Sequence, residues 1–176
     1  MIVSARTVVL VEGLSDRIAL ETLAARRGRD LDAEGVAVVA IGGAQAVGRF
    51  VERYAPSGVR IAGLCDAREE PSFRRGFERA GAGALGFTVC VADLEDELIR
   101  SLGAAAVEEV VDAQGDLGSF RTLQKQPQWR GRPVEAQLRR FLGSGARRKM
   151  RYASLLVDAL DLECVPRPLD GVLALT

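Results

Sequence analysis

The sequence predicts an α/β fold built on a parallel four-stranded sheet with a C-terminal helical appendage, and three observations support this. Short apolar runs recur along the first half of the chain, separated by stretches with helical spacing. The first run contains no polar residue, as expected for a strand covered on both faces. Toward the C-terminus only helical spacing remains. Alternating strands and helices imply parallel strands joined by right-handed crossovers.

The apolar runs and the helical stretches alternate in order along the chain. Strands are predicted at residues 7–11, 36–41, 60–65 and 87–91, and helices at 15–27, 44–54, 71–80 and 94–102. The alternation stops near residue 115, after which residues 133–142 and 147–160 have helical spacing and Pro166 and Pro168 precede a last short helix. We therefore predict a core domain at residues 1–114 and a basic helical appendage at residues 115–176.

The composition is that of a globular domain. Of its 176 residues, 48% are hydrophobic and 27% are charged. A chain of this length is long enough to bury a hydrophobic core. No apolar run approaches the roughly 20 residues of a membrane span, and the N-terminus does not resemble a signal peptide. Three scattered cysteines are too few for a disulfide framework, and Cys65 and Cys90 fall within apolar runs as small buried residues would. A cytoplasmic protein is expected.

The absence of histidine excludes several kinds of chemistry. Nucleophilic systems that use a Ser-His-Asp or Cys-His arrangement need an imidazole base. Zinc, copper and non-haem iron sites usually need imidazole ligands. An enzyme with this composition therefore has carboxylates, lysine, arginine and a hard metal ion as its tools. Carboxylates and water select magnesium, calcium or manganese.

Charge is distributed unevenly along the chain although the net charge is zero. Residues 91–116 contain eight acidic residues against one arginine, and residues 121–151 contain ten basic residues against one glutamate. This asymmetry suggests a metal-holding acidic region beside a phosphate-binding basic region. The alternative is that the two segments neutralise each other in the folded protein. The candidate nucleic-acid-binding residues are Arg121, Lys125, Arg130, Arg147, Arg148 and Arg151.

Acidic residues end three of the four predicted strands. Glu12 follows the first strand, Asp66 the third and Asp93 the fourth. Parallel strands bring their carboxyl ends to one edge of the sheet, where ligands bind in such folds. Carboxylates gathered there repel each other, and a divalent cation would relieve that repulsion. The alternatives are that loops are polar in any case, that Glu12 is a solvated loop residue, and that Asp16 only favours the start of the first helix electrostatically.

Several of these stretches resemble a known family. VVLVEGLSD at 8–16 and LCDAREE at 64–70 resemble the first and second motifs of the TOPRIM domain of topoisomerases, primases and some nucleases. With DLEDEL at 93–98 and RRKMRYA at 147–153, the chain is most similar to the TOPRIM half of the overcoming-lysogenisation-defect (OLD) nucleases and to small actinobacterial TOPRIM nucleotidyl transferase/hydrolase domain proteins. The resemblance implies a Rossmann-like TOPRIM sheet and covers nearly the whole chain.

The resemblance also implies roles for individual residues. In OLD nucleases the first-motif glutamate and the acid four residues later bind metal, later aspartates complete a two-metal site, and a late lysine assists cleavage. Carried over by motif, the implied cofactor is Mg²⁺ or Mn²⁺, as one or two ions. The implied metal ligands are Glu12, Asp16, Asp66, Asp93 and Glu95, and the implied catalytic residues are Glu12 and Lys149.

Two departures from the family pattern qualify these roles. The second acid of the Asp-x-Asp motif is Arg68, a permanent cation that should repel a second metal ion. Glu69 or Glu70 could substitute for it from a different backbone position. No G-x-x-x-x-G-K-[ST] loop occurs in the sequence, so we expect the ATPase half of the OLD nucleases to be absent.

The sequence therefore predicts a metal-dependent nuclease or nucleotidyl transferase/hydrolase that acts on nucleic-acid phosphodiesters. The expected partners are nucleic acid, with DNA favoured, a separate ATPase subunit and a second copy of the chain, and no membrane. A second hypothesis is a TOPRIM module that only binds nucleic acid or a partner ATPase, which Arg68 favours. A third, ranked well below these, is a receiver-like domain with Asp66 as phosphoacceptor. Trp129 has two interpretations: it stacks on a base, or it fills the seam between core and appendage.

Overall fold

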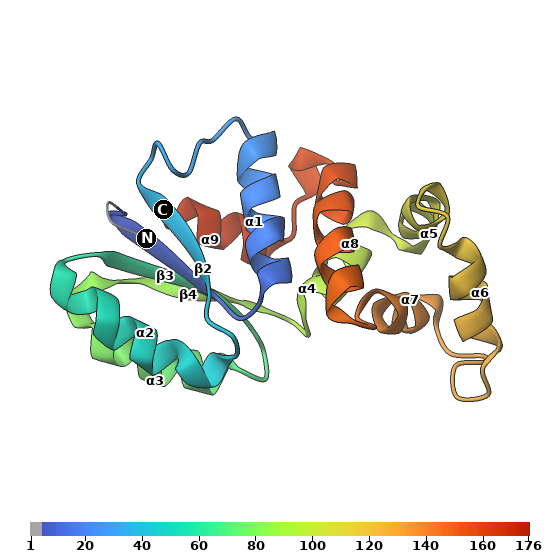
Figure 1. Cartoon of the computed structure of the whole chain (residues 1–176), viewed down its shortest axis with the longest axis horizontal. Coiled ribbons are helices and arrows are strands. Elements are labelled where there is room, and N and C mark those ends of the chain that lie inside the picture. Colours follow the sequence, from blue (N-terminus) through green and yellow to red (C-terminus); the bar gives the residue numbers. More distant parts are fainter. Residues whose placement is uncertain (1–4) are drawn as a thin grey trace.

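The computed structural model describes residues 5–176 and has a four-stranded parallel sheet in the order β2-β1-β3-β4 (Figure 1). The strands are β1 (Thr7–Val11), β2 (Val36–Ala40), β3 (Arg60–Asp66) and β4 (Ala84–Cys90). The helices are α1 (Leu14–Arg26), α2 (Val47–Tyr54), α3 (Glu70–Ala80), α4 (Leu94–Leu102), α5 (Ala104–Ala113), α6 (Leu117–Lys125), α7 (Val134–Leu142), α8 (Ala146–Ala159) and α9 (Arg167–Ala174). The predicted α/β class and parallel topology are confirmed.

Strand β1 lies inside the sheet and is covered on both faces, which explains its uninterrupted apolar run. All four residues from Val8 to Val11 are fully buried. Val8 and Leu10 pack with residues of α2 and α3, whereas Val9 and Val11 pack with α1 on the opposite face. The carboxyl end of β1 is thus held between two helical layers.

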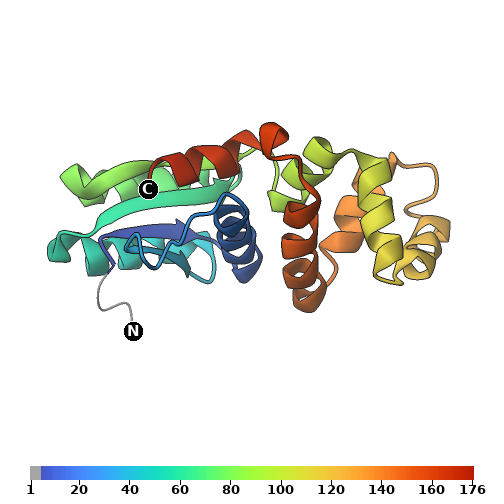
Figure 2. The same cartoon turned by 90° about the horizontal axis from the view of Figure 1, so that it is seen from above.

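The C-terminal helices return to the sheet. Helix α8 packs along α1, and α9 packs against β4 and β3. The Arg26 guanidinium donates hydrogen bonds to the carbonyl oxygens of Val157 and Leu160, which joins the end of α1 to the end of α8. Figure 2 shows α9 lying along the sheet and α5–α7 at the far end of the molecule, with α8 between them. One continuous hydrophobic cluster joins sheet and helices.

The structure differs from the predicted elements at several places. Helices α5 and α6 lie in residues for which no helix was predicted. Strand β4 begins at Ala84, three residues before the predicted start, because the glycine-rich stretch there pairs with β3 instead of forming a loop. Gly86, at φ +113, accommodates a shift in register between Ile61 and Ala62. Cys65 and Cys90 are buried free thiols, as predicted. Among residues 5–176, no helix is long and apolar enough to cross a membrane.

Candidate functional site

A cleft of about 360 Å³ lies at the carboxyl ends of the strands. Helices α1 and α8 lie side by side, and their N-terminal ends point to this same end of the sheet (Figure 1). The strand ends and the two helix starts therefore surround one space. It is lined by Glu12, Gly13, Ser15, Asp16, Gly42, Gly43, Asp66, Asp93, Leu94, Glu95 and Lys149. All five acids implied as metal ligands, and the implied catalytic lysine, line this cleft.

The backbone of Glu12 is fixed by a glycine turn that follows β2. The N–H groups of Gly42 and Gly43 both donate to the carbonyl oxygen of Glu12, at 3.1 and 3.2 Å. These glycines have φ values of +74 and +109, a region that other residues avoid. Because their N–H groups are already used by Glu12, this turn positions the first acid and is not a phosphate-binding loop.

Glu12 carries a buried oxygen without a hydrogen-bond partner. Its Oε2 atom is the buried side-chain oxygen or nitrogen in residues 5–176 that no protein group satisfies. Burial and the nearby charge of Glu69 raise the pKa of the Glu12 carboxyl. Buried carboxylate oxygens are normally hydrogen-bonded or paired with a charge. An oxygen without a partner in an acidic cleft is therefore one that a bound cation would satisfy.

Asp16 and Asp66 face the same space. Asp16 closes the first turn of α1, where its Oδ2 accepts the Gly13 N–H at 2.8 Å. Burial raises the pKa of Asp16 to about 6 despite that hydrogen bond. Asp66 is the last residue of β3, and burial together with the charges of Asp16 and Glu12 raises its pKa to about 7. Both carboxyls thus resist ionisation in the absence of a compensating positive charge.

Protein cations hold the two acids that follow β4. Asp93 caps α4, accepting the Asp96 N–H at 2.9 Å with Oδ1, and its Oδ2 lies 2.7 Å from Nη2 of Arg139. Glu95 is buried, and its Oε1 lies 3.3 Å from Nζ of Lys149. Burial opposes the charge of Lys149, but the acids around it, Glu95 above all, outweigh burial and raise its pKa. Lys149 is therefore a cation in this cleft.

The carboxylate oxygens of the cleft suit a hard divalent cation, but they do not converge on a single position. Within residues 5–176, no group of three or more acidic or cysteine side chains has the arrangement of a metal site. The reason is visible in the contacts above, because Asp16, Asp93 and Glu95 are each bonded to a protein donor. Glu12 and Asp66 make no such contact among the described residues, and they remain the acids best placed to bind a metal ion.

Arg68, which replaces the second acid of the motif, is exposed and does not line the cleft. It makes no ion pair with any acid in the described part of the chain. Of its two acidic neighbours, Glu70 pairs with the exposed Arg74, whereas the charge of Glu69 raises the pKa of Glu12. Of these two glutamates, Glu69 is therefore the one whose charge acts on Glu12.

Ion pairs between the acidic and basic segments neutralise part of the charge asymmetry. Of the predicted nucleic-acid-binding residues, Arg121 pairs with Glu108 and Arg151 pairs with Asp116. Arg148 hydrogen-bonds Ser144 and lies over the Phe141 ring, 4.2 Å from its centre. Within residues 5–176, the members of the basic segment that form no ion pair are Lys125, Arg130, Arg132, Arg140, Arg147 and Arg148.

Trp129 lies in the connection between α6 and α7, half-buried beside Arg132, whose guanidinium carbon is 5.3 Å from the ring centre. Figure 1 shows this connection at the end of the helices that faces away from the sheet. The connection that carries Trp129 is thus remote from the sheet, and both interpretations of Trp129 stay predictions.

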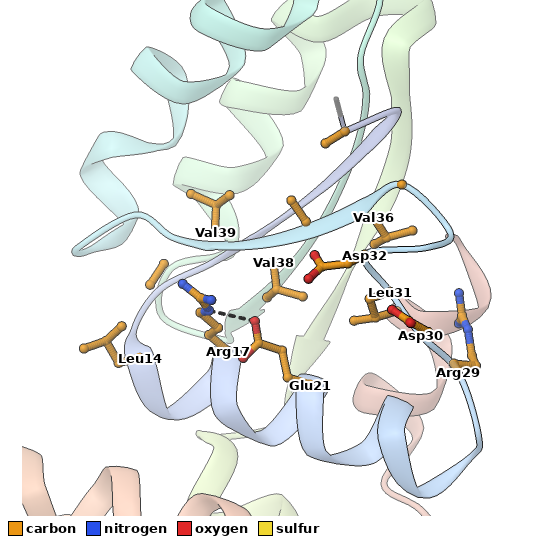
Figure 3. Close-up of a pocket in the computed structure, with 14 residues that line it drawn as sticks. Leu14, Arg17, Glu21, Arg29, Asp30, Leu31, Asp32, Val36, Val38 and Val39 are labelled. Carbon is orange, nitrogen blue, oxygen red and sulfur yellow. Dashed lines mark hydrogen bonds and ion pairs between the residues drawn. The ribbon is translucent and has the colours of Figure 1, made fainter. Parts of the chain in front are cut away.

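A larger groove, of about 690 Å³, runs along the free edge of β2 (Figure 3). Val36 and Val38 of β2 line it together with the Arg17–Glu21 ion pair of α1. None of the acids at the strand ends lines this groove. It lies beside the sheet instead of at the carboxyl ends of its strands, so the smaller acidic cleft is the better candidate for chemistry.

Residues 5–67 match the family model of the overcoming lysogenization defect protein-like TOPRIM domain. This part of the chain is therefore similar to an OLD-like TOPRIM domain. This match spans β1 to β3, and so includes Glu12, Asp16 and Asp66. No curated protein matches the chain by sequence.

Two solved structures extend the similarity in fold to almost the whole chain. One is the C-terminal region of the Burkholderia pseudomallei OLD protein, with a TM-score of 0.65 and 16% identity over 97% of this chain and 96% of that one. The other is the C-terminal region of the Xanthomonas campestris pv. campestris OLD protein, with a TM-score of 0.65 and 21% identity over 97% and 93%. TOPRIM domains of this type are associated with nucleases and generally bind divalent metals.

Arg139 pairs with Asp93, a residue that lines the cleft, although the sequence did not mark it as a site residue. It is one of ten basic residues in residues 121–151, and no motif in the sequence distinguishes it from the others. Its contact with Asp93 joins residues 46 positions apart and depends on the packing of α7 against α4. No local sequence signal reports such a contact.

Proposed function

We propose that the protein is a metal-dependent phosphodiesterase of nuclease type that acts on nucleic acid. The observation that carries this proposal is the cleft itself, in which an unpartnered buried oxygen of Glu12, the strand-end Asp66 and the cationic Lys149 lie together. Acids and a lysine in one cleft are the groups that phosphodiester hydrolysis requires when histidine is absent.

Glu12 and Asp66 would hold a divalent ion, Mg²⁺ or Mn²⁺, with Asp16 and Glu95 as further ligands when their present partners are released. The ion, when bound, would activate water and stabilise charge on the scissile phosphate. The chain's own contribution is to hold these carboxylates on rigid strand ends, since Glu12 is fixed by the glycine turn and Asp66 by β3 pairing.

Lys149 would stabilise the negative charge that develops on the phosphate or its leaving oxygen. It stands in the first turn of α8, which has no acidic residue and whose dipole favours anions. Its present partner, Glu95, is also one of the proposed metal ligands. Metal binding to Glu95 would free Lys149 for the substrate.

The test is a cleavage assay on supercoiled plasmid and on structured RNA, with EDTA and with Mg²⁺ or Mn²⁺. The chain has two lysines, so Lys125→Gln is a matched control for Lys149→Gln. At saturating nucleic acid, where weaker binding does not lower the rate, we expect cleavage only with metal, an unchanged rate in Lys125→Gln, and a loss of about 100-fold or more in Lys149→Gln, the size of effect seen when a transition-state electrostatic contact is removed. Equal activity of the two variants would refute the role of Lys149.

Nucleic acid should bind through the basic residues that have no ion pair. Replacing Arg147 and Arg148 together with glutamate is expected to lower affinity for all sequences alike and to flatten the dependence on salt, because phosphate contacts release counterions. Arg49 and Arg53 are exposed on α2, in the other helical layer, and their replacement with glutamate is the matched control. Fluorescence anisotropy at several salt concentrations measures both. An equal loss in the two double variants would mean that only net charge matters.

The second candidate is a TOPRIM module that binds without cutting. Two observations favour it: three of the five acids already have protein partners, and Arg68 replaces an acid of the second motif. The same assays separate the two candidates, because this module would bind nucleic acid and leave every substrate intact with either metal.

A further inference from the structure

We infer that Asp93 is a positioning residue that holds Arg139 at the cleft as a phosphate-binding group, and is not itself a metal ligand. This rests on the proposed function. It changes the role of one of the five implied ligands and adds a residue to the substrate site.

The first step concerns the oxygens of Asp93, both of which are occupied. Oδ1 accepts the Asp96 N–H as the cap of α4. Oδ2 accepts a hydrogen bond from Arg139 Nε at 2.8 Å and lies 2.7 Å from Arg139 Nη2. Metal binding by Asp93 would have to use the one acceptor position left on Oδ1, beside the capping N–H, or displace a charged hydrogen-bond partner from Oδ2. The other oxygens of the cleft offer easier ligands, since Glu12 Oε2 has no partner to lose.

The second step concerns the guanidinium of Arg139. Two of its nitrogens engage Asp93, and no other acceptor lies within hydrogen-bond distance of it in the described part of the chain. Its side chain is 40% exposed. A guanidinium has five N–H donors in a rigid plane, so Arg139 keeps donors for a ligand while Asp93 fixes its orientation. Such a fixed, partly exposed arginine suits the oxygens of a phosphate.

The third step compares Arg139 with the other arginines that pair with acids. Arg121 and Arg151 pair with Glu108 and Asp116, and neither of these acids lines the cleft. The partner of Arg139 lines it, beside Lys149. Arg139 and Lys149 therefore present two cations to one acidic cleft, one from α7 and one from α8. That arrangement fits a phosphodiester bound across the mouth of the cleft.

The experiment has a metal arm and a nucleic-acid arm, both with the full chain. In the first, calorimetric titration with Mn²⁺ compares Asp66→Asn and Asp93→Asn. We expect weaker binding in Asp66→Asn and an unchanged dissociation constant in Asp93→Asn. Asparagine is also a good helix cap, so the Asp93 variant should keep α4 folded. Equal weakening in both variants would make Asp93 a ligand and overturn the inference.

In the second arm, the affinity for an oligonucleotide is measured in EDTA, where no cleavage occurs. Arg139→Gln should bind roughly tenfold more weakly, as expected for the loss of one charge-assisted hydrogen bond. Arg49→Gln, at an exposed arginine of α2 in the other helical layer and outside the basic segment, is the control and should change little. Equal binding by the two variants would refute the phosphate contact. If the unmodified protein binds no Mn²⁺, the proposed function loses its metal site, and this arm alone decides the role of Arg139.

Discussion

Replacing Glu12 with glutamine is expected to abolish the stabilisation of the protein by divalent cations. A ligand present at 100 times its dissociation constant stabilises the folded state by about 2.7 kcal/mol. For a chain of this length that corresponds to a rise in melting temperature of about 5–10 °C. Glutamine removes the charge at the buried oxygen that no protein group satisfies, so the ion loses its central ligand. Cleavage should fall by more than the roughly 10–100-fold that loss of an outer-shell partner costs.

The same variant makes an opposite prediction without metal. Burial and the charge of Glu69 disfavour the ionised Glu12 carboxyl, so Glu12→Gln should melt at a higher temperature than the unmodified protein in EDTA at pH 8. Glu109 is an exposed acid outside the cleft, and Glu109→Gln is the matched control. Differential scanning calorimetry with EDTA and with excess Mn²⁺ measures both effects. A melting temperature of the unmodified protein that is identical in the two buffers would argue against any metal site.

The metal-free protein is expected to lose stability as pH rises from about 4 to about 7. Asp66 and Asp16 have pKa values raised to about 7 and about 6 in the folded state, from 3.8. The native state therefore holds protons that the unfolded chain has already released, and stability must fall through this interval. One pKa unit corresponds to about 1.4 kcal/mol, so the two carboxyls together should lower the free energy of unfolding by at most about 7 kcal/mol by pH 8, and by less because solvent screens the partly exposed Asp66.

Denaturant unfolding in EDTA between pH 4 and pH 8 measures this loss. Asp66→Asn should flatten the profile, because the amide does not titrate. Excess Mn²⁺ should do the same above pH 7 in the unmodified protein, where a bound cation compensates the charges. Stability that stays level or rises over this interval in EDTA would show that the strand-end acids are ionised without cost.

Much of the fold follows from local signals in the sequence. The apolar run before Glu12 predicts a buried strand, and its boundaries are those observed for β1. Helix α4 also agrees with its predicted residues, because Asp93 and three acids in its first turn mark its start. Helix α5 was missed because it buries only Val107 and Val111, so its apolar period is weak. The start of β4 was missed because Gly86, together with Gly81 and Gly83 just before the strand, resembles a loop, although Gly86 pairs with β3.

The arrangement of the charges shows the limit of those signals. The sequence contains an acidic segment followed by a basic one. From the sequence alone, these segments could either bind ligands or neutralise each other in the folded protein. The structure contains four pairs between the two segments, and leaves six basic residues without an ion pair in residues 5–176. Which cation pairs with which acid depends on how α7 and α8 pack. The order of charges along the chain does not specify that packing.

The sequence by itself determined the acids at the strand ends, since parallel strands with acidic ends must bring them to one edge of the sheet. Only the tertiary structure decided what each acid contacts. Asp93 meets Arg139 because α7 packs on α4, and Glu95 meets Lys149 because α8 lies along α1. Glu12 keeps an unpartnered oxygen because neither cation reaches it. The ends of strands are determined by the local hydrophobic pattern, which can be recognised in the sequence. The partners of a buried charge are determined by packing between distant segments, which local sequence patterns do not predict.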